Sequence, residues 1–419
     1  MIDRPQGGEL AVLVHINFPA GGMQEDLSEF KELARSAGAT PASIITGTRQ
    51  TPDPKYFVGG GKANEIHEHV KLHNAELVIF NHQLSPAQER NLEQLLQCRV
   101  VDRTGLILDI FAQRARSFEG KLQVELAFLK HMSTRLVRGW THLERQRGGI
   151  GLRGGPGETQ LETDRRLIRA RIQFITQRLD RVKKQRDQSR RARSRASVPT
   201  VALVGYTNAG KSTLFNALTG AEVYIANRLF ATLDPTLRRI DLPEVGTVIL
   251  ADTVGFIRHL PHDLVDAFHA TLEEVSQADL LLHVVDVHDS QKLMNIKQVN
   301  EVLKSIDADA VPQLIVHNKI DLCDLLEPGV DRNREGRATR VRVSAHTGAG
   351  MEYLKTAIIE CLSGEIGTYS LTLLPRQAAL RAELYRRSAV VTEEIDDEGH
   401  FHLHVRLPRK DWGKIQSQL

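Results

Sequence analysis

Cysteines and long hydrophobic runs are scarce in this sequence, and each scarcity excludes a class of protein. Three cysteines in 419 residues, odd in number and widely spaced, do not make a disulfide framework or a zinc cluster. We expect Cys98, Cys323 and Cys361 to be reduced packing residues. The longest apolar runs, such as Leu280–Val285, are far shorter than the ~20 residues of a membrane-spanning helix. Because the start of the chain has no apolar signal core, we expect a cytoplasmic protein without a membrane span.

The overall composition is that of a folded protein with several domains. Hydrophobic residues make up 41% and charged residues 26% of the chain, which is ordinary for globular proteins and argues against wholesale disorder. At roughly 150 residues per domain, the length suggests about three domains. We expect a monomer.

Positive charge is concentrated in one part of the chain. The net charge of the whole sequence is +3, but residues 103–197 contain 23 lysines and arginines against 9 acidic residues. This region therefore carries +14 and the remainder −11. Of the 23 basic residues 19 are arginines, whose guanidinium group pairs with phosphates and stacks on bases, so the region is predicted to bind RNA or DNA. A charged coiled coil with a solvated face is the alternative.

Residues 1–105 are predicted to form an N-terminal α/β subdomain. Short apolar runs alternate with amphipathic stretches: Ala11–His15, Glu25–Ala37, Ser43–Thr46, Lys62–Asn74, Glu76–Phe80, a helix from Ser85-Pro86, and Arg99–Asp102. This alternation implies a small parallel sheet covered by helices. The run Val58-Gly-Gly-Gly-Lys62 invites comparison with a second nucleotide site, such as one for ATP. It lacks phosphate-loop spacing, so a strand-to-helix turn is the favoured interpretation.

Residues 106–196 are predicted to form a long antiparallel helical hairpin. Two apolar seams with spacings of four and three residues indicate the two helices: Leu122, Leu126, Leu129, Ser133 and Leu136, then Ile168, Ile172, Ile175, Leu179 and Val182. The connection, residues 145–158, contains six glycines and a proline and cannot be helical. Because Arg145, Arg147 and Arg153 flank it, we favour contact with nucleic acid over simple connection. Residues 186–196 are charged and predict a frayed helix end or linker.

Two further domains are expected after the hairpin. A new domain begins at Val198-Pro199, and strands and helices alternate again through residues 197–364. Residues 365–419 form a small C-terminal domain with a strand at 400–407 whose apolar face holds Phe401, Leu403 and Val405. The histidines of the other face, His400, His402 and His404, could bind a metal, but without a fourth ligand nearby an exposed strand face is favoured.

A phosphate-binding loop lies in residues 205–212. The apolar run Thr200–Val204 leads into Gly205-Tyr-Thr-Asn-Ala-Gly-Lys211-Ser212, and a helical stretch follows. The glycines allow backbone N–H groups to surround the β-phosphate. Lys211 is expected to reach the β- and γ-phosphates, and the Ser212 hydroxyl is expected to ligate Mg²⁺.

Four more elements follow in the order that guanine-nucleotide binding requires. Asp252-Thr-Val-Gly255 ends an apolar run and supplies a carboxylate for the Mg²⁺ shell and a glycine N–H for the γ-phosphate. Thr232, within Phe230-Ala-Thr-Leu-Asp234, offers a hydroxyl to the metal when the γ-phosphate is present. In Asn318-Lys-Ile-Asp321 the last carboxylate can accept from N1–H and the amine of guanine. Ser344-Ala-His346 supplies a backbone contact to the guanine oxygen.

The candidate site residues follow from these motifs. The catalytic candidates are Lys211, Thr232, Gly255 and Asn208, and the Mg²⁺ ligands are Ser212, Thr232 and Asp252. The residues expected to contact GTP or GDP are Gly205, Tyr206, Thr207, Asn208, Ala209, Gly210, Lys211, Ser212, Phe230, Ala231, Thr232, Leu233, Asp234, Asp252, Thr253, Val254, Gly255, Asn318, Lys319, Ile320, Asp321, Ser344, Ala345 and His346.

The motifs together resemble a known family of P-loop GTPases. Residues 229–236, Leu-Phe-Ala-Thr-Leu-Asp-Pro-Thr, and 151–166, Gly-Leu-Arg-Gly-Gly-Pro-Gly-Glu-Thr-Gln-Leu-Glu-Thr-Asp-Arg-Arg, are similar to those of the HflX family. The resemblance extends from about residue 10 to the C-terminal strand. It implies a multidomain α/β fold: a central P-loop GTPase domain with a doubly wound sheet, an N-terminal α/β domain with the helical hairpin, and a small C-terminal α/β domain.

The same resemblance implies a partner and a cellular role. It implies binding to the large ribosomal subunit, with the glycine loop of the hairpin reaching its rRNA, and separation of stalled or idle ribosomes under stress. In potassium-activated relatives the position of Asn208 carries an asparagine that ligates K⁺ beside the phosphates. The alternative is that Asn208 only tolerates the backbone conformation of the loop.

Hydrolysis is expected to be slow in the free protein. Many GTPases place a water-orienting glutamine directly after Asp-x-x-Gly, whereas this chain has Phe256, whose side chain cannot form a hydrogen bond. The charge that develops on the transferred phosphoryl group must be neutralised by an arginine or a metal supplied in cis, or by a group supplied by the partner.

Two other functional classes are compatible with parts of the sequence. In one, the protein is a GTP-regulated adaptor whose hairpin binds a protein or a non-ribosomal RNA. In the other, it is an ATP-driven kinase or transporter subunit, which Asn318–Asp321 opposes.

Overall fold

The computed structural model shows two compact units. It describes residues 8–19, 27–139, 160–195, 198–220, 230, 233, 236–243, 245–257, 272, 274–363, 366–386, 389–396 and 399–416. The first unit contains the described residues up to Arg181 together with Phe230 and Leu233. The second contains the remaining described residues, which begin at Val182.

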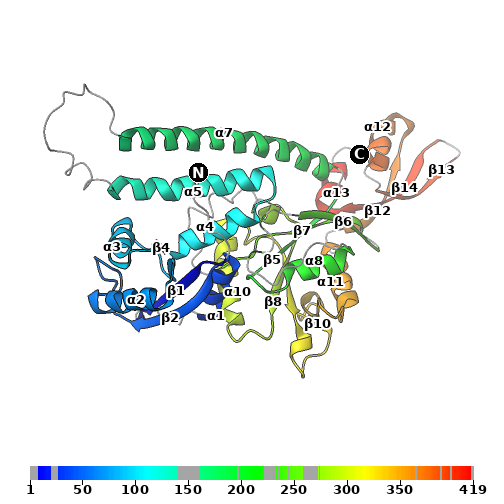
Figure 1. Cartoon of the computed structure of the whole chain (residues 1–419). Coiled ribbons are helices and arrows are strands. Elements are labelled where there is room, and N and C mark those ends of the chain that lie inside the picture. Colours follow the sequence, from blue (N-terminus) through cyan, green and yellow to red (C-terminus); the bar gives the residue numbers. More distant parts are fainter. Residues whose placement is uncertain are drawn as a thin grey trace. The chain divides into compact units, whose positions relative to one another are not determined.

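A four-stranded parallel sheet forms the centre of the first unit (Figure 1). Its strands, in the spatial order β2-β1-β3-β4, are β1 (Leu10–Asn17), β2 (Thr40–Thr48), β3 (Leu77–Phe80) and β4 (Arg99–Val101). Its helices are α1 (Leu27–Ser36), α2 (Gly60–His73), α3 (Pro86–Leu96) and α4 (Arg103–Arg114). Apolar residues of α2 and α3 pack on the face of β1 that carries Val12 and Val14. The predicted parallel α/β arrangement is therefore confirmed.

Two helix starts in this unit follow local sequence signals. Helix α3 begins where Ser85-Pro86 predicts it: the Ser85 hydroxyl accepts from the Gln88 N–H, and the Gln88 amide accepts from the Ser85 N–H. Helix α2 begins at Gly60, inside the glycine run, and Gly59 before it has a φ of 43°. The connection from strand β2 to α2 contains a loop closed by an isolated bridge between Asp53 and Phe57, so the glycine run ends a strand-to-helix connection, as expected, but does not follow the strand directly.

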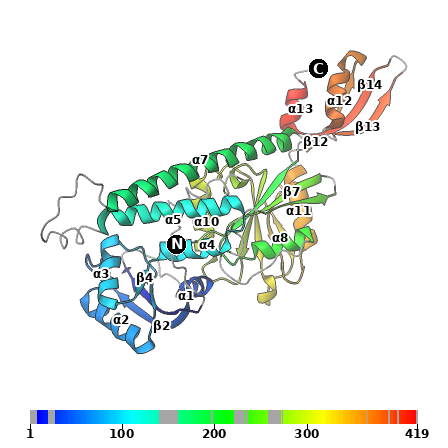
Figure 2. The same cartoon turned by 45° about the horizontal axis from the view of Figure 1, so that its top comes forward.

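The predicted helical hairpin is present as α5 (Phe118–Gly139) and α7 (Gln160–Arg195), which run side by side in Figures 1 and 2. Leu122 and Leu126 of α5 bury against Ile175 of α7, with Leu129, Ile172 and Leu179 packed around them. Glu125 pairs with Arg171, and the earlier residue Phe118 contacts the later residue Arg178. The helices are therefore antiparallel, as the two seams predict. The glycine-rich connection lies outside the described residues, and α7 extends to Arg195, as expected for a helix end there.

The second unit contains a seven-stranded sheet in the order β10-β11-β9-β8-β5-β7-β6. Its strands are β5 (Thr200–Gly205), β6 (Thr236–Leu242), β7 (Gly246–Asp252), β8 (Leu280–Asp286), β9 (Gln313–Asn318), β10 (Gly329–Arg332) and β11 (Ala338–Arg342). Only the edge strands β6 and β10 pair antiparallel to their neighbours. Helices α8 (Lys211–Thr219) and α11 (Met351–Ser363) cover one face, and α10 (Lys292–Ser305) packs on β5 and β8. Because Leu280, Leu282 and Val284 face α8 and α11, the alternate residues of β8 face the opposite side, so the sheet is doubly wound as predicted.

The C-terminal residues form an antiparallel sheet with the order β12-β14-β13. Its strands are β12 (Ile366–Leu373), β13 (Val390–Ile395) and β14 (Phe401–Pro408), and its helices are α12 (Ala378–Arg386) and α13 (Arg409–Gln416). Leu403 and Val405 are buried, as the alternation predicts. His402 and His404 are exposed and contact Thr372 and Ser370 of β12. Among the described residues no cluster of three or more metal-binding side chains occurs.

The three cysteines have the unpaired state that the sequence predicts. All three cysteines are unpaired, and Cys98 and Cys361 pack against apolar clusters. Burial raises the pKa of the Cys98 thiol to about 11, which keeps it protonated and unreactive. Within the described part of the chain, no helix has the length and apolar character needed to cross a membrane.

Candidate nucleotide-binding site

The phosphate loop connects β5 to α8 through two left-handed residues. Asn208 has a φ of 61° and Gly210 a φ of 91°. A side chain at Gly210 would collide with the Asn318 amide, and one at Gly205 would collide with the Val284 carbonyl. Gly205 is therefore required by the close approach of the Val284 backbone, and Gly210 by its left-handed conformation and the close Asn318 side chain. Asparagine tolerates left-handed backbone better than most residues, so this conformation is compatible with Asn208 whether or not its amide also binds a cation.

Lys211, the first residue of α8, lies beneath the loop. Its side chain is buried, and its ammonium donates to the carbonyls of Gly205 at 3.0 Å and Tyr206 at 2.7 Å. Burial lowers the pKa of Lys211 to about 8, and the nearby Asp252 carboxylate opposes this shift. The amine is therefore held against the carbonyls at the start of the loop, from which it is expected to reach the phosphates.

Ser212 and Asp252 meet where the Mg²⁺ ligands are expected. The Ser212 hydroxyl donates to the Asp252 carboxylate over 2.9 Å, although the two residues are 40 positions apart in the sequence. A hydroxyl and a carboxylate oxygen are hard donors of the kind Mg²⁺ prefers, so this pair fits the metal. The third expected ligand, Thr232, lies outside the described residues.

The segment after Asp252 pairs with the phosphate loop. The Thr207 N–H donates to the Phe256 carbonyl at 2.8 Å, and the Phe256 N–H donates to the Gly205 carbonyl at 3.1 Å. A side chain at Gly255 would lie 3.0 Å from the Thr207 methyl group and 3.1 Å from the Lys211 ammonium. The Phe256 side chain is buried. It therefore leaves the position after Gly255 without a group that could orient water.

Asn318 joins the phosphate loop to the predicted guanine-binding loop. Its buried amide donates to the Ala209 carbonyl at 2.9 Å and accepts from the Ala345 N–H at 2.9 Å. The Ser344 hydroxyl donates to the Asp321 carboxylate at 2.5 Å. The structure thus brings together four of the five predicted segments of this site: 205–212, 252–255, 318–321 and 344–346.

All four segments follow the carboxyl ends of strands in the second unit. Strand β5 ends at Gly205, β7 at Asp252 and β9 at Asn318, and these strands are parallel. Ligands of open α/β sheets bind at this edge. Lys319, with a φ of 66°, also pairs with Asp286 at the end of β8 over 2.7 Å. Asp286 was not among the predicted residues, although its place at the end of an apolar run is the same signal that identified Asp252.

The structure describes two residues, Phe230 and Leu233, of the fifth predicted segment, residues 230–234. Ala231, Thr232 and Asp234 lie outside the described part of the chain. Phe230 and Leu233 belong to the first unit, where both are buried and the Phe230 ring packs edge-to-face on Phe111 of α4, 4.7 Å between centroids. This aromatic contact was not predicted, because nothing in the local sequence links positions 111 and 230.

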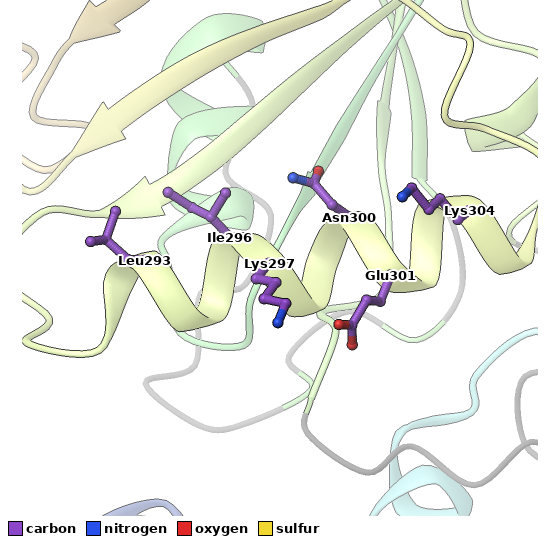
Figure 3. Close-up of a pocket in the computed structure, with 6 residues that line it drawn as sticks. All are labelled: Leu293, Ile296, Lys297, Asn300, Glu301 and Lys304. Atoms are coloured by element: carbon purple, nitrogen blue, oxygen red, sulfur yellow. The ribbon is translucent and has the colours of Figure 1, made fainter. Parts of the chain in front are cut away.

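One hollow in the described residues lies away from these motifs. It has a volume of about 380 Å³ and is lined by α10 residues Leu293, Ile296, Lys297, Asn300, Glu301 and Lys304 (Figure 3). Leu293 is exposed. None of the six belongs to a predicted nucleotide-binding segment.

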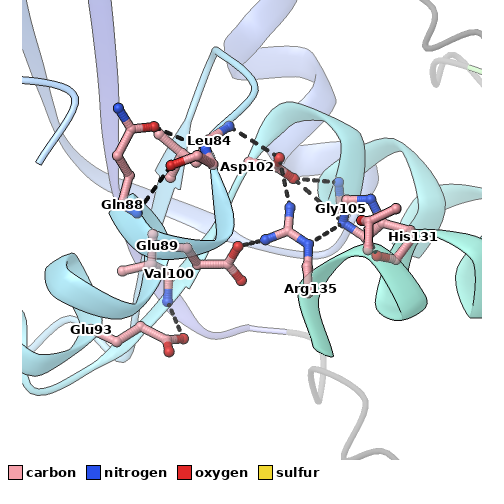
Figure 4. A network of polar contacts seen from close by, with 11 residues as sticks. Leu84, Gln88, Glu89, Glu93, Val100, Asp102, Gly105, His131 and Arg135 are labelled. Atoms are coloured by element: carbon pink, nitrogen blue, oxygen red, sulfur yellow. Dashed lines mark hydrogen bonds and ion pairs between the residues drawn. The ribbon is translucent and has the colours of Figure 1, made fainter. Parts of the chain in front are cut away.

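A polar network that the sequence did not indicate attaches the hairpin to the sheet of the first unit (Figure 4). Asp102 is buried, caps α4 through the Gly105 N–H at 2.8 Å, and accepts from Arg135 of α5 at 2.9 Å. Arg135 also pairs with Glu89 of α3. Burial lowers the pKa of Arg135 to about 10, so it remains charged at neutral pH. Because a buried ion pair of this kind is costly to break, the network holds α5 to α3 and α4.

His283 of β8 is expected to make the second unit sensitive to acid. Its side chain is buried on the sheet, and desolvation lowers its pKa from 6.5 to about 4. The unfolded chain takes up a proton near pH 6.5 and the folded chain does not. As the pH is lowered from 6.5 to about 4, the free energy of unfolding should therefore fall by up to about 1.4 kcal/mol for each pH unit.

Urea unfolding at a series of pH values measures this effect. We expect His283→Gln to show a shallower loss of stability between these pH values than the parent. His288→Gln, which changes an exposed histidine just after the same strand, serves as the control and should follow the parent. Equal slopes for the His283 variant and the parent would contradict the prediction.

The fold and the site together define a P-loop GTPase: a doubly wound sheet, a phosphate loop between β5 and α8, and guanine-type motifs at the same strand ends. Four family models match the chain: GTP-binding GTPase N-terminal over residues 24–112, GTP-binding GTPase middle region over 114–193, 50S ribosome-binding GTPase over 200–319, and HflX C-terminal domain over 330–419. The chain belongs to the HflX family of GTPases.

Individual relatives are similar along the whole chain. GTPase HflX of Escherichia coli (strain K12) is 60% identical over 418 residues, covering 100% of this chain and 98% of the relative. GTPase HflX of Magnetococcus marinus is 43% identical over 422 residues, covering 100% and 97%. A crystal structure of SsGBP and GDP complex is 26% identical with a TM-score of 0.48, covering 84% of this chain and 97% of that one. The protein hydrolyses GTP to GDP and phosphate.

Proposed function

We propose that this GTPase binds the large ribosomal subunit through its basic hairpin and separates stalled or idle ribosomes under stress. The observation that carries the proposal is the exposed arginine face of α7, including Arg169, Arg178 and Arg181. The buried seam of α7 faces α5, so this cationic surface is left for a polyanion. The match of residues 200–319 to a model described as 50S ribosome-binding GTPase supports the ribosome as that polyanion.

The nucleotide would be held by the strand-end segments of the second unit. Asp321 recognises guanine, and Lys211 and the N–H groups of the phosphate loop bind the phosphates. Ser212, Thr232 and Asp252 hold Mg²⁺, which neutralises phosphate charge when it is bound. Gly255 and Thr232 respond to the γ-phosphate. The hydrogen bond between Ser212 and Asp252 and the bridging role of Asn318 support this arrangement.

Hydrolysis is proposed to be slow alone and faster on the ribosome, because Phe256 supplies no water-orienting group. K⁺ is a candidate activator beside Asn208. The protein is proposed to act in the cytoplasm as a monomer. The division into residues 1–105, 106–196, 197–364 and 365–419 is the proposed domain organisation, with the second part contacting rRNA.

Replacing five hairpin arginines tests the proposed contact. We expect the change of Arg145, Arg147, Arg153, Arg165 and Arg166 to glutamine to weaken binding to large subunits. It should also flatten the dependence of log affinity on log salt by roughly 0.7 to 0.9 for each phosphate that the hairpin no longer neutralises. Sedimentation with purified subunits at several salt concentrations measures both effects.

A matched variant removes the same charge elsewhere. The exposed residues Arg35, Arg238, Arg239, Arg334 and Arg376 lie outside the basic region, and their change to glutamine should leave the slope unchanged. If the hairpin variant keeps the parent slope, the hairpin is a scaffold and not the RNA contact. If sedimentation with subunits resists both high salt and ribonuclease, a GTP-regulated adaptor that binds protein becomes the better interpretation.

A further inference from the structure

Two exposed phenylalanines on the hairpin alternate with two arginines. Phe118 at the start of α5 is 59% exposed, and Phe174 of α7 is 45% exposed. The Arg178 guanidinium lies 5.5 Å from the centre of the Phe118 ring and 5.0 Å from that of Phe174. The Arg171 guanidinium lies 5.4 Å from Phe174. We call this continuous row, Arg171, Phe174, Arg178 and Phe118, the stacking row.

The helix repeat explains why these side chains meet. Positions 171, 174 and 178 share one face of α7 with spacings of three and four residues. The seam residues Ile172, Ile175 and Leu179 lie one position further along, so the stacking row runs beside the buried seam and outside it. Phe118 joins the row from α5 because the two helices are antiparallel.

The row is held in place before any ligand arrives. Glu125 of α5 accepts from Arg171 in a two-pronged hydrogen bond of 2.7 and 3.0 Å. This pairing orients the planar guanidinium and neutralises the Glu125 carboxylate. Arg178 is positioned by cation–π attraction to the two rings, which remain substantially open to solvent.

The chemistry of the row points to unpaired nucleic-acid bases. Exposed aromatic rings next to arginines bind single strands because every base offers a flat face for stacking, while the arginines attract the backbone. The row lies in the part of the chain that carries +14, which complements a polyanion and repels a basic protein partner. A duplex keeps the faces of its bases stacked internally and offers these rings its backbone and groove edges instead.

We propose that Arg171, Phe174, Arg178 and Phe118 form a platform on which unpaired bases of RNA stack. The inference deepens the proposed function, since it assumes that the hairpin binds RNA and adds the class of RNA that it prefers. The unpaired bases can belong to ribosomal RNA or to another single strand, because the same chemistry serves both.

A substitution series separates stacking from apolar contact. Phe174→Leu keeps apolar bulk but removes the aromatic face, and Phe174→Trp enlarges that face. The probes are a 12-nucleotide single-stranded RNA and a 12-base-pair RNA duplex. We expect Phe174→Leu to weaken single-strand binding roughly 5- to 150-fold, with duplex binding and the salt slope unchanged. Phe118→Leu should act in the same direction.

Phe174→Trp supplies a spectroscopic signature. It should bind the single strand at least as tightly as the parent, and the emission that the substitution adds to that of the two native tryptophans should be quenched by the RNA. Leu72→Ala, an exposed apolar residue on α2, is the matched control and should change neither binding nor slope. Circular dichroism and thermal midpoints verify that each variant is folded.

The outcomes distinguish this inference from the function on which it rests. If Phe174→Leu binds the single strand as tightly as the parent, or loses single-strand and duplex binding equally, the platform is overturned. A flattened salt slope for the five-arginine variant would still support the hairpin as the RNA contact in that case. If the parent binds neither probe nor large subunits, both proposals fail together. If large subunits bind but mutation of Phe118 and Phe174 has no effect on either RNA, only the platform is refuted.

Discussion

Asp321→Asn is expected to change the nucleotide preference of this GTPase from GTP to xanthosine triphosphate. A carboxylate at position 321 accepts from both N1–H and the exocyclic amine of guanine. An asparagine can accept from only one, and its own N–H would face a donor. A site that is built to hydrogen-bond a ligand binds it much more weakly when a buried polar group is left unpaired. The affinity for GTP should therefore fall roughly 10²- to 10⁴-fold. Xanthine has an oxygen in place of that amine, and this oxygen accepts a hydrogen bond from the new asparagine amide.

The structure explains why this residue should dominate base specificity. Asp321 lies in the short helical turn Ile320–Leu322, directly after β9, and the Ser344 hydroxyl donates to its carboxylate at 2.5 Å. The Thr347 N–H in turn donates to the Ser344 hydroxyl at 3.1 Å. The carboxylate is therefore oriented by the loop that is expected to contact the guanine oxygen.

Competition between the two nucleotides for a fluorescent analogue measures the effect. Asp324→Asn removes an equal charge from an exposed carboxylate three residues later and should retain the parent preference for GTP. If Asp321→Asn also keeps that preference, the assignment of Asp321 to base recognition is wrong.

The second large effect concerns the rate of hydrolysis. Large ribosomal subunits should accelerate GTP turnover more than any group of the free protein, because Phe256 is buried and cannot orient water. A charge-stabilising group supplied by a partner is typically worth roughly 10³- to 10⁵-fold in rate. We expect stimulation toward this range, with faster turnover in K⁺ than in Na⁺, and expect the difference between the two salts to vanish in Asn208→Ala.

The left-handed conformation of Asn208 requires a control for this experiment. Because Asn208 has a φ of 61°, the change Asn208→Ala adds backbone strain in addition to removing the amide. Asn208→Gly removes the amide without that strain, so it should lose the K⁺ effect while keeping GTP affinity. Phosphate release measured in KCl and NaCl, with and without subunits, gives all the rates. Equal rates in the two salts under both conditions would exclude the cation, and a fast free enzyme would require a catalytic group outside these motifs.

Much of the architecture is encoded in local patterns. The alternating seams predicted the hairpin because leucine and isoleucine at spacings of three and four residues can be buried together only on one face of a helix. The strand at 401–408 followed from strict alternation, and the start of α3 followed from Ser85-Pro86. The phosphate loop was recognisable because its glycines must fit close backbone contacts in any chain that binds a phosphate in this way.

The sequence also located most of the candidate site, because the motifs follow runs of buried strand residues and parallel strands end at the same edge of a sheet. It did not indicate how those motifs hold one another. Asn318 links Ala209 to Ala345, which are more than 100 residues apart, and Lys319 pairs with Asp286. Such contacts depend on which strands become neighbours, and no local preference encodes that order.

By itself, then, the sequence determined the elements, the nucleotide motifs and the basic region of this GTPase, since each depends on residues a few positions apart. Only the tertiary structure decided that Arg135 attaches the hairpin to Asp102 and Glu89, that Phe230 packs on Phe111, and that Phe118 completes a row of rings and arginines begun on α7. These contacts join residues that are distant in the chain. Their formation depends on how whole elements pack to bury their apolar faces, and that packing is a property of the complete fold.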